Sequence, residues 1–176
     1  MAWEVLADYS TMFPPYFLME RAFDDYKLDS KPAGAHPTNQ CAIRMSIALG
    51  RSGFSLSAFP VPHRVKTTTH LPVPYVMGAN ELAEYLKTLW GYPVVFRSNL
   101  NTVTRELSNR KGIIYFNNCF HRSEDPEGSR QGDHIDLWNG SHYYNQLYNI
   151  RAGMEDRLSS GPLFTRSNSV WFFELF

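Results

Sequence analysis

The sequence has little cysteine, no excess of charge of either sign, and no long apolar run. Its two cysteines, Cys41 and Cys119, stand in no CxxC pair or metal-ligand cluster, so no disulfide framework is expected. Lys plus Arg and Asp plus Glu number 17 each, which leaves no overall field to attract nucleic acid or an anionic membrane. No segment approaches the roughly 18 to 20 apolar residues of a membrane helix. We therefore expect neither nucleic-acid binding nor membrane insertion.

The composition that remains is that of a globular protein. Of the 176 residues, 43% are hydrophobic and 15% are aromatic, which is enough to build a core without disulfides. This length suits a single domain spanning residues 1–176. The N-terminal segment MAWEVLADYS carries acidic residues in place of a basic region, so the sequence shows no export signal.

Apolar periodicity and breaker residues predict an α+β protein. A helix that begins at Cys41 has apolar residues around much of its circumference and should be buried, with Thr38 or Asn39 as its N-cap and Gly50 at its end. Residues 51–78 are rich in proline and are expected to form an irregular loop. The other expected elements are helices at residues 3–9, 16–26, 80–91 (capped by Asn80) and 102–109, and strands at residues 94–97, 112–118 and 169–176. Helices come first and mostly antiparallel strands follow, without βαβ alternation.

The segment HIDLWNGSHYYN predicts a β-hairpin. Its two strands are joined by Asn139-Gly140, a dipeptide typical of two-residue turns because both residues tolerate positive φ. The pairs that such a turn would bring face to face are Trp138 with Ser141, Asp136 with Tyr143, and His134 with Asn145.

Cys41 is the candidate nucleophile. The N–H groups of a helix's first turn carry partial positive charge, which favours a thiolate and makes the sulfur nucleophilic at neutral pH. Most cysteines in folded proteins are buried and inert, so a catalytic role also requires a base beside the thiol. Cys119 ends the strand at residues 112–118 and is expected to be a buried, structural thiol.

His134 is the candidate base, because it begins the first hairpin strand in a defined register. Asn145, directly opposite, is the preferred partner of its ring, since opposed Cβ atoms lie about 4.5 to 5.5 Å apart and residues two apart on one strand roughly 7 Å. Asp136 is the rival, because it projects from the same face and a carboxylate would stabilise an imidazolium. Histidines that lie in predicted loops, and are expected to be solvated, are His36, His63, His70 and His121.

Two segments, NQCAIRMSIAL around Cys41 and GDHIDLWNG around His134, resemble the fourth family of type VI secretion amidase effectors, and the likeness spans most of the chain. The resemblance implies a papain-like fold of the NlpC type, in which a helix bears the catalytic cysteine and an antiparallel sheet supplies the histidine. Cys41 and His134 match the family's residues directly. The family's third residue is an aspartate on the strand after the turn, and Asn145 occupies the matching position here.

The resemblance also implies an activity and partners. The expected reaction is cleavage of the γ-D-glutamyl to meso-diaminopimelate bond in peptidoglycan stem peptides. The protein would be made in the cytoplasm, delivered by the type VI secretion apparatus, and active in the periplasm of a recipient Gram-negative cell. A cognate immunity protein, typically a dimer that inserts a loop into the catalytic groove, would inhibit it.

Thiol hydrolysis requires no metal or other cofactor, and the histidines show no HExxH spacing. The backbone N–H of Cys41 is expected to hold the oxyanion, with Gln40 as a candidate second donor. Acyl transfer would use the same residues.

A function of another class stays open, namely a catalytically weak or inactive module that binds cell-wall peptide or a protein through Tyr143, Tyr144 and Tyr148.

Overall fold

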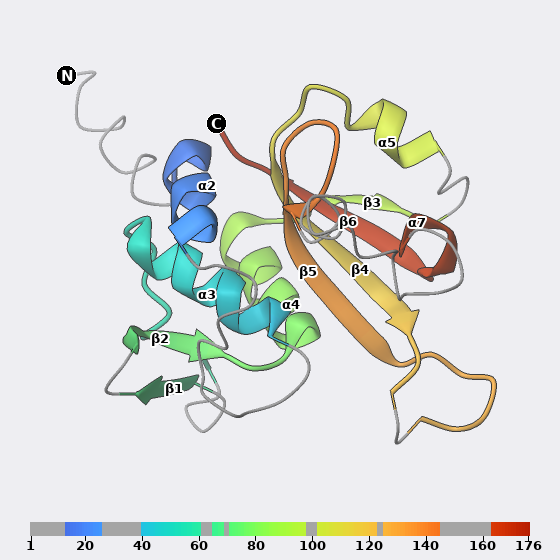
Figure 1. Ribbon diagram of the computed structural model, residues 1–176, viewed down its shortest axis with the longest axis horizontal. Helices are drawn as coiled ribbons and strands as arrows, with labels where there is room; N and C mark the ends of the chain where they lie inside the picture. Colours follow the sequence, from blue (N-terminus) through green and yellow to red (C-terminus); the bar gives the residue numbers. More distant parts are fainter. Residues whose placement is uncertain are drawn as a thin grey trace. The chain divides into compact units, whose positions relative to one another are not determined.

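The computed structural model describes residues 13–25, 40–60, 65–68, 71–97, 102–122, 125–144 and 163–176 (Figure 1). The chain divides into two compact units, the first comprising Met1–Tyr92 with Leu175–Phe176 and the second comprising Pro93–Glu174. The single domain expected for residues 1–176 stays a prediction. The helix expected at residues 3–9 lies outside the described residues. Within the described part, no helix is long and apolar enough to cross a membrane.

The first unit is built around a buried helix. Its elements are α2 (Tyr16–Asp25), α3 (Cys41–Arg51), β1 (Val65–Thr68), β2 (Leu71–Val76) and α4 (Ala79–Trp90). Helix α3 packs against α2, β2 and α4, and seven of its eleven residues are buried, as its apolar circumference predicts (Figure 1). This confirms the buried helix that begins at Cys41. The helix continues one residue past Gly50, the end expected from the sequence.

The proline-rich residues 51–78 are not wholly irregular, so that expectation is wrong for two segments. Strands β1 and β2 form an antiparallel ribbon, although β2 contains Pro72 and Pro74. The N–H of Val76 donates to Ser46 Oγ on α3 at 3.0 Å, and the register of the ribbon shifts between the pairs Lys66–Tyr75 and Thr68–Leu71, the interval of β2 that contains both prolines. Proline is tolerated at such an irregular position, because no regular ladder of hydrogen bonds needs its missing N–H there.

Helix α4 begins at Ala79 with Gly78 as its N-cap, so the expectation that Asn80 caps it is wrong by two positions. Leu82 and Leu86 of this helix are fully buried, whereas Leu89 is 42% exposed in the last turn. The helix is followed by Gly91 at φ 83°, a value that glycine adopts without strain.

The second unit holds a four-stranded antiparallel sheet with the strand order β3-β6-β4-β5. The strands are β3 (Val94–Phe96), β4 (Gly112–Phe120), β5 (Gly132–Trp138) and β6 (Ser169–Glu174), and the short helices are α5 (Val103–Glu106) and α7 (Leu163–Arg166) (Figure 1). Strand β4 lies between β5 and β6, which confirms the central strand predicted from its β-branched and aromatic residues.

The predicted hairpin after β5 is wrong in register. Trp138 pairs with Tyr143 instead of Ser141, and Asn139 N–H donates to His142 O at 3.1 Å, so the turn is centred on Gly140 and Ser141. The side chain of Asn139 explains this shift, because its Oδ1 accepts the N–H groups of Ser141 at 3.0 Å and His142 at 2.9 Å. An asparagine that bonds in this way stands at the first corner of a turn rather than at its centre.

Gly140 has φ 99° in this turn, as a residue at the first central position requires. Beyond the single bridge at Tyr143, the chain becomes helical at Tyr144, so the second hairpin strand is absent from the described residues 141–144. The pairing of Asp136 with Tyr143 that the two-residue turn predicted is therefore also wrong.

Candidate active site

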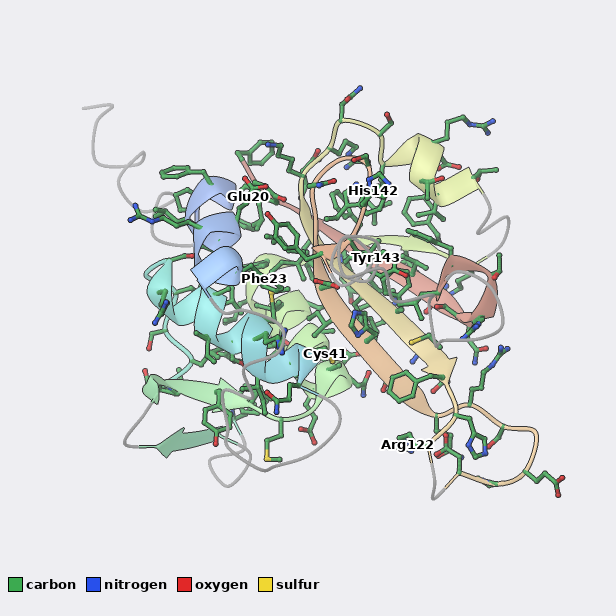
Figure 2. The ribbon with its side chains drawn as sticks, in the orientation of Figure 1. Glu20, Phe23, Cys41, Arg122, His142 and Tyr143 are labelled. Atoms are coloured by element: carbon green, nitrogen blue, oxygen red, sulfur yellow. The ribbon has the colours of Figure 1, made fainter. Side chains whose placement is uncertain are left out.

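Cys41 is the first residue of α3, and Figure 2 shows it at that end of the helix. The N-cap is Gln40, so the expectation of Thr38 or Asn39 as the cap is wrong. The first intrahelical bond runs from Arg44 N–H to Gln40 O at 3.0 Å, which places the N–H groups of residues 41–43 at the helix mouth. Cys41 is partly exposed, whereas Ala42 and Ile43 are buried. A thiol in this position is accessible to a substrate and lies at the positive end of the helix dipole.

Ser46 fixes the first turn of α3 to β2. Its hydroxyl donates to Ala42 O at 2.8 Å and accepts the N–H of Val76 at 3.0 Å, and the residue is fully buried. The helix that carries the thiol is thus joined to the ribbon by a hydrogen bond as well as by apolar packing. No local pattern indicates this contact, because the two partners lie thirty residues apart.

His134 and Asp136 form a hydrogen-bonded pair on β5. His134 Nε2 lies 3.1 Å from Asp136 Oδ2, and the side chains are 12% and 4% exposed. A carboxylate can only accept, so the Nε2–H donates to Asp136. The other carboxylate oxygen, Oδ1, accepts the N–H of Leu137 at 2.8 Å. Asp136 is therefore held by the backbone while it orients the imidazole, which is the role expected of the third group in a catalytic triad.

Aromatic rings surround the imidazole. Phe116 faces His134 from β4, and their ring centroids lie 6.1 Å apart. Tyr143, labelled in Figure 2, lies 6.2 Å from the imidazole in an edge-on arrangement and 5.4 Å from Phe116. Both aromatic residues are buried, so the ring of His134 is confined on two sides. Neither residue was identified from the sequence, although the strand pattern of 112–118 could have indicated Phe116 once the pairing with β5 was known.

The other candidate residues differ in their burial and in whether the structure describes them. Cys119 is fully buried in an apolar cluster with Phe116 and Phe164, which confirms its predicted burial. Asn145 lies outside the described residues, and the turn at Asn139-Gly140 that set it opposite His134 is wrong by one position. Gln40 is buried at the helix mouth, and its predicted role as an oxyanion donor stays a prediction. His121 is exposed, as expected of a histidine in a loop.

The thiol and the imidazole lie in different compact units, Cys41 in the first and His134 in the second. The first unit holds a cysteine at a helix N-terminus and the second holds a histidine bonded to a carboxylate, the two groups that the sequence predicts as nucleophile and base. The approach of the two groups to one another stays a prediction.

Comparison with known proteins gives a family that matches most of the chain. The family described as type VI secretion system (T6SS), amidase effector protein 4, matches residues 38–173, a span that contains Cys41, His134 and Asp136 as well as Asn145. A search of curated proteins found no match.

Solved structures show the same fold at low sequence identity. The effector of the Tae4/Tai4 effector–immunity system from Salmonella typhimurium is 20% identical with a TM-score of 0.65, over 93% of this chain and 99% of that chain. The type VI effector Tae4 from Enterobacter cloacae is 18% identical with a TM-score of 0.64, over 95% and 99%. The Tae4–Tai4 complex from Enterobacter cloacae gives 16% and 0.60, over 93% and 99%. The predicted α+β, papain-like fold is thereby confirmed.

Proposed function

The chain belongs to the family of type VI secretion system amidase effector protein 4, whose members are peptidoglycan amidases, and from this premise we propose a thiol mechanism for its reaction. The bond cleaved is the one between the γ-carbonyl of D-glutamate and meso-diaminopimelate in a stem peptide. Cys41 is the nucleophile and His134 is the base. The observation that carries this assignment is the bond from His134 Nε2 to Asp136 Oδ2 at 3.1 Å, because an imidazole oriented by a buried carboxylate is suited to taking a proton.

The first half of the reaction forms a thioester. His134 is bonded to Asp136 through Nε2, so its Nδ1 takes the thiol proton of Cys41. The thiolate adds to the γ-carbonyl carbon, and the backbone N–H of Cys41 stabilises the oxyanion, with Gln40 as the second donor. The tetrahedral intermediate collapses when the C–N bond breaks and the imidazolium protonates the departing amine. Asp136 stabilises the imidazolium while it exists.

The second half releases the acyl group. Water enters in place of the amine, His134 Nδ1 accepts one of its protons, and the hydroxyl adds to the thioester carbonyl. The C–S bond then breaks, and the proton returns from the imidazolium to the Cys41 sulfur. The products are a stem peptide that ends in D-glutamate and a fragment with a new amino group on meso-diaminopimelate.

The orienting role in this scheme belongs to Asp136, whose Oδ2 lies 3.1 Å from His134 Nε2. Asn145 is retained as the residue at the family's third position, where its amide oxygen would accept the same Nε2–H in place of Asp136. An amide can orient an imidazole but carries no charge to balance the imidazolium, and Asp136 supplies that charge. The proposed catalytic set is therefore Cys41 and His134 with either Asn145 or Asp136 as the partner of the ring, and the charge of the imidazolium favours Asp136.

The chain belongs to a family of type VI secretion effectors and is therefore secreted by that system. We infer that it acts in the periplasm of the recipient cell, where stem peptides are accessible. Two of the similar solved structures are named as effector–immunity pairs of Tae4 with Tai4. By analogy, the producing cell should hold a cognate immunity protein that inhibits this amidase.

Digestion of purified Gram-negative sacculi tests the proposed function. Mass analysis of the muropeptides should show fragments that end in D-glutamate after treatment with the wild type, and none after treatment with Cys41→Ala or His134→Ala. Cys119→Ala is the matched control, because it removes the other thiol of the chain from a buried site, and it should cleave like the wild type.

Product formed by Cys41→Ala would end the proposal. If the wild type binds sacculi and forms no product, the chain is instead an inactive papain-like module that binds cell-wall peptide.

A further inference from the structure

Strand β4 contains a bulge next to the residue that faces His134. Phe116 pairs with His134, and the next pair along the two strands is Phe120 with Gly132. Four steps on β4 therefore correspond to two steps on β5, so β4 carries two extra residues in this interval. Bulges bend a strand and change the direction of neighbouring side chains, and they are common next to active sites. The bulge thus ends at the cross-strand partner of the proposed base.

Asn118 within this bulge has a backbone conformation that residues with a side chain rarely adopt. Its φ is 51°, and the only other described non-glycine residue with positive φ is Asn109, in the turn before β4. Asparagine tolerates positive φ better than most L-residues, but this conformation still costs free energy relative to extended backbone. Contacts that a neighbouring group makes with the bulge offset this cost.

Asp133 is that group. Its Oδ1 accepts the backbone N–H of Asn118 at 2.9 Å and the side-chain amide of Asn117 at 3.3 Å. The Asn117 amide also reaches the hydroxyl of Tyr115 at 3.2 Å. On the other side of β4, Asn117 O accepts the N–H of Asn168 at 2.9 Å. The bulge is thus fixed to β5 through one carboxylate and to the segment before β6 through one backbone bond.

We propose that Asp133 is a positioning residue for His134, acting through the β4 bulge. The inference rests on the proposed function, in which His134 is the catalytic base. Successive residues of a strand point to opposite faces, so Asp133 projects away from the face that His134 and Asp136 share. It acts by holding Asn118 at positive φ, which fixes where the pair of Phe116 and His134 sits along the strands.

Loss of the carboxylate would let the two extra residues of β4 relax toward regular strand geometry. Such a change shifts the pairing of β4 with β5 at His134, where the imidazole must meet Asp136 and the thiol. A misplacement of about 1 Å in a catalytic group can cost roughly 100-fold in rate. Substrate affinity depends on other contacts, so the loss should be in kcat and not in KM.

The first test compares Asp133→Ala with Asp133→Asn, using a soluble peptide that contains the γ-D-glutamyl to meso-diaminopimelate bond. Asp133→Ala should lower kcat by roughly 10- to 100-fold and change KM by less than about twofold. Asp133→Asn keeps an oxygen that can accept the N–H of Asn118, and its kcat should stay within about threefold of wild type. The ring ¹H–¹⁵N signals of His134 should shift in Asp133→Ala and not in Asp133→Asn, a difference that a purely structural role would not produce.

A second pair of variants, at Asn118, tests the bulge itself. This pair keeps the inference testable if Asp133→Ala does not fold. Asn118→Gly relieves the strain of positive φ and should keep wild-type kcat, whereas Asn118→Ala lacks that freedom and should lose activity as Asp133→Ala does. The double variant Asp133→Ala with Asn118→Gly should recover most of the lost kcat.

Wild-type kcat in Asp133→Ala and Asn118→Ala, beside an inactive His134→Ala, would overturn this inference and leave the proposed function standing. An equal loss of activity in Asn118→Gly and Asn118→Ala would also overturn it. Full activity of His134→Ala would instead refute the proposed function, and the inference with it.

Discussion

His134 donates from Nε2 to Oδ2 of Asp136 at 3.1 Å, although the two residues lie two positions apart on the same strand. The carboxylate is almost completely buried, and its second oxygen is held by the N–H of Leu137. This contact gives the proposed base a fixed tautomer and a charged partner within a single strand. The loop after β5 is consequently not required to complete the pair.

Substitutions at Asp136 and Asn145 should separate the two partners proposed for the ring. We expect Asp136→Ala to lower kcat by about 100-fold or more, because the imidazolium loses its charged partner and its fixed tautomer. Asp136→Asn should lie between that variant and the wild type. Steady-state cleavage of the stem peptide measures kcat for the wild type and for each variant at the two positions. A larger loss in Asn145→Ala than in Asp136→Ala would assign the orienting role to Asn145.

The two thiols should differ in their reaction with iodoacetamide. Cys41 is partly exposed at a helix mouth and Cys119 is fully buried, so the native protein should be alkylated at Cys41 alone. Pairing with His134 would increase the reactivity of the Cys41 sulfur, because the imidazole takes up the thiol proton. Peptide mapping by mass spectrometry across pH 5 to 9 measures the rates. His134→Ala should slow the alkylation of Cys41, and equal rates in this variant and the wild type would contradict the proposed pairing of the thiol with the imidazole.

Ser46→Ala should destabilise the protein more than Ser52→Ala does. Ser46 accepts the buried N–H of Val76, and its loss leaves that group without this acceptor, at a cost of about 1 to 3 kcal/mol in the free energy of unfolding. Ser52 has only the bond it donates to Ala48 O, a carbonyl that also accepts the N–H of Ser52, so its removal should cost less. Urea unfolding of both variants measures the difference. Equal free energies would show that the link between α3 and β2 contributes nothing.

Acidification should remove the contribution of the Arg110–Glu174 pair to stability. Arg110 donates to both oxygens of Glu174, at 2.9 and 2.7 Å, and these hydrogen bonds lower the pKa of Glu174 below its ordinary value. A carboxylate with a lowered pKa contributes stability above its unfolded pKa of about 4.3, and this contribution is lost as the pH falls through the folded value. The pair is about one-third exposed, so the effect should be small.

The measurement is the difference in the free energy of unfolding between the wild type and Glu174→Gln. It should be largest at pH 7 and shrink below about pH 4. A difference that grows on acidification would contradict the lowered pKa of Glu174.

Local patterns predicted much of the fold. The apolar circumference of the segment after Cys41 predicts a buried helix whether or not its neighbours are known, and α3 is that helix. The β-branched and aromatic run at residues 112–118 likewise predicts a central strand, and β4 takes that place. Both predictions depend on the spacing of side chains along one segment, which the sequence contains in full.

The sequence by itself determined which residues could carry the chemistry, because a cysteine at a helix start and a histidine beside a carboxylate on one strand are visible in the order of residues. Tertiary structure decided which partners they meet. The hydrogen bonds of the Asn139 side chain place the turn one residue later than predicted. The side chains of His134 and Asp136 are long enough to form a hydrogen bond, although residues two apart on a strand have widely spaced Cβ atoms. Hydrogen-bond partners such as Val76 for Ser46 and Asn118 for Asp133 depend on where separate segments lie in space, and no local pattern encodes that placement.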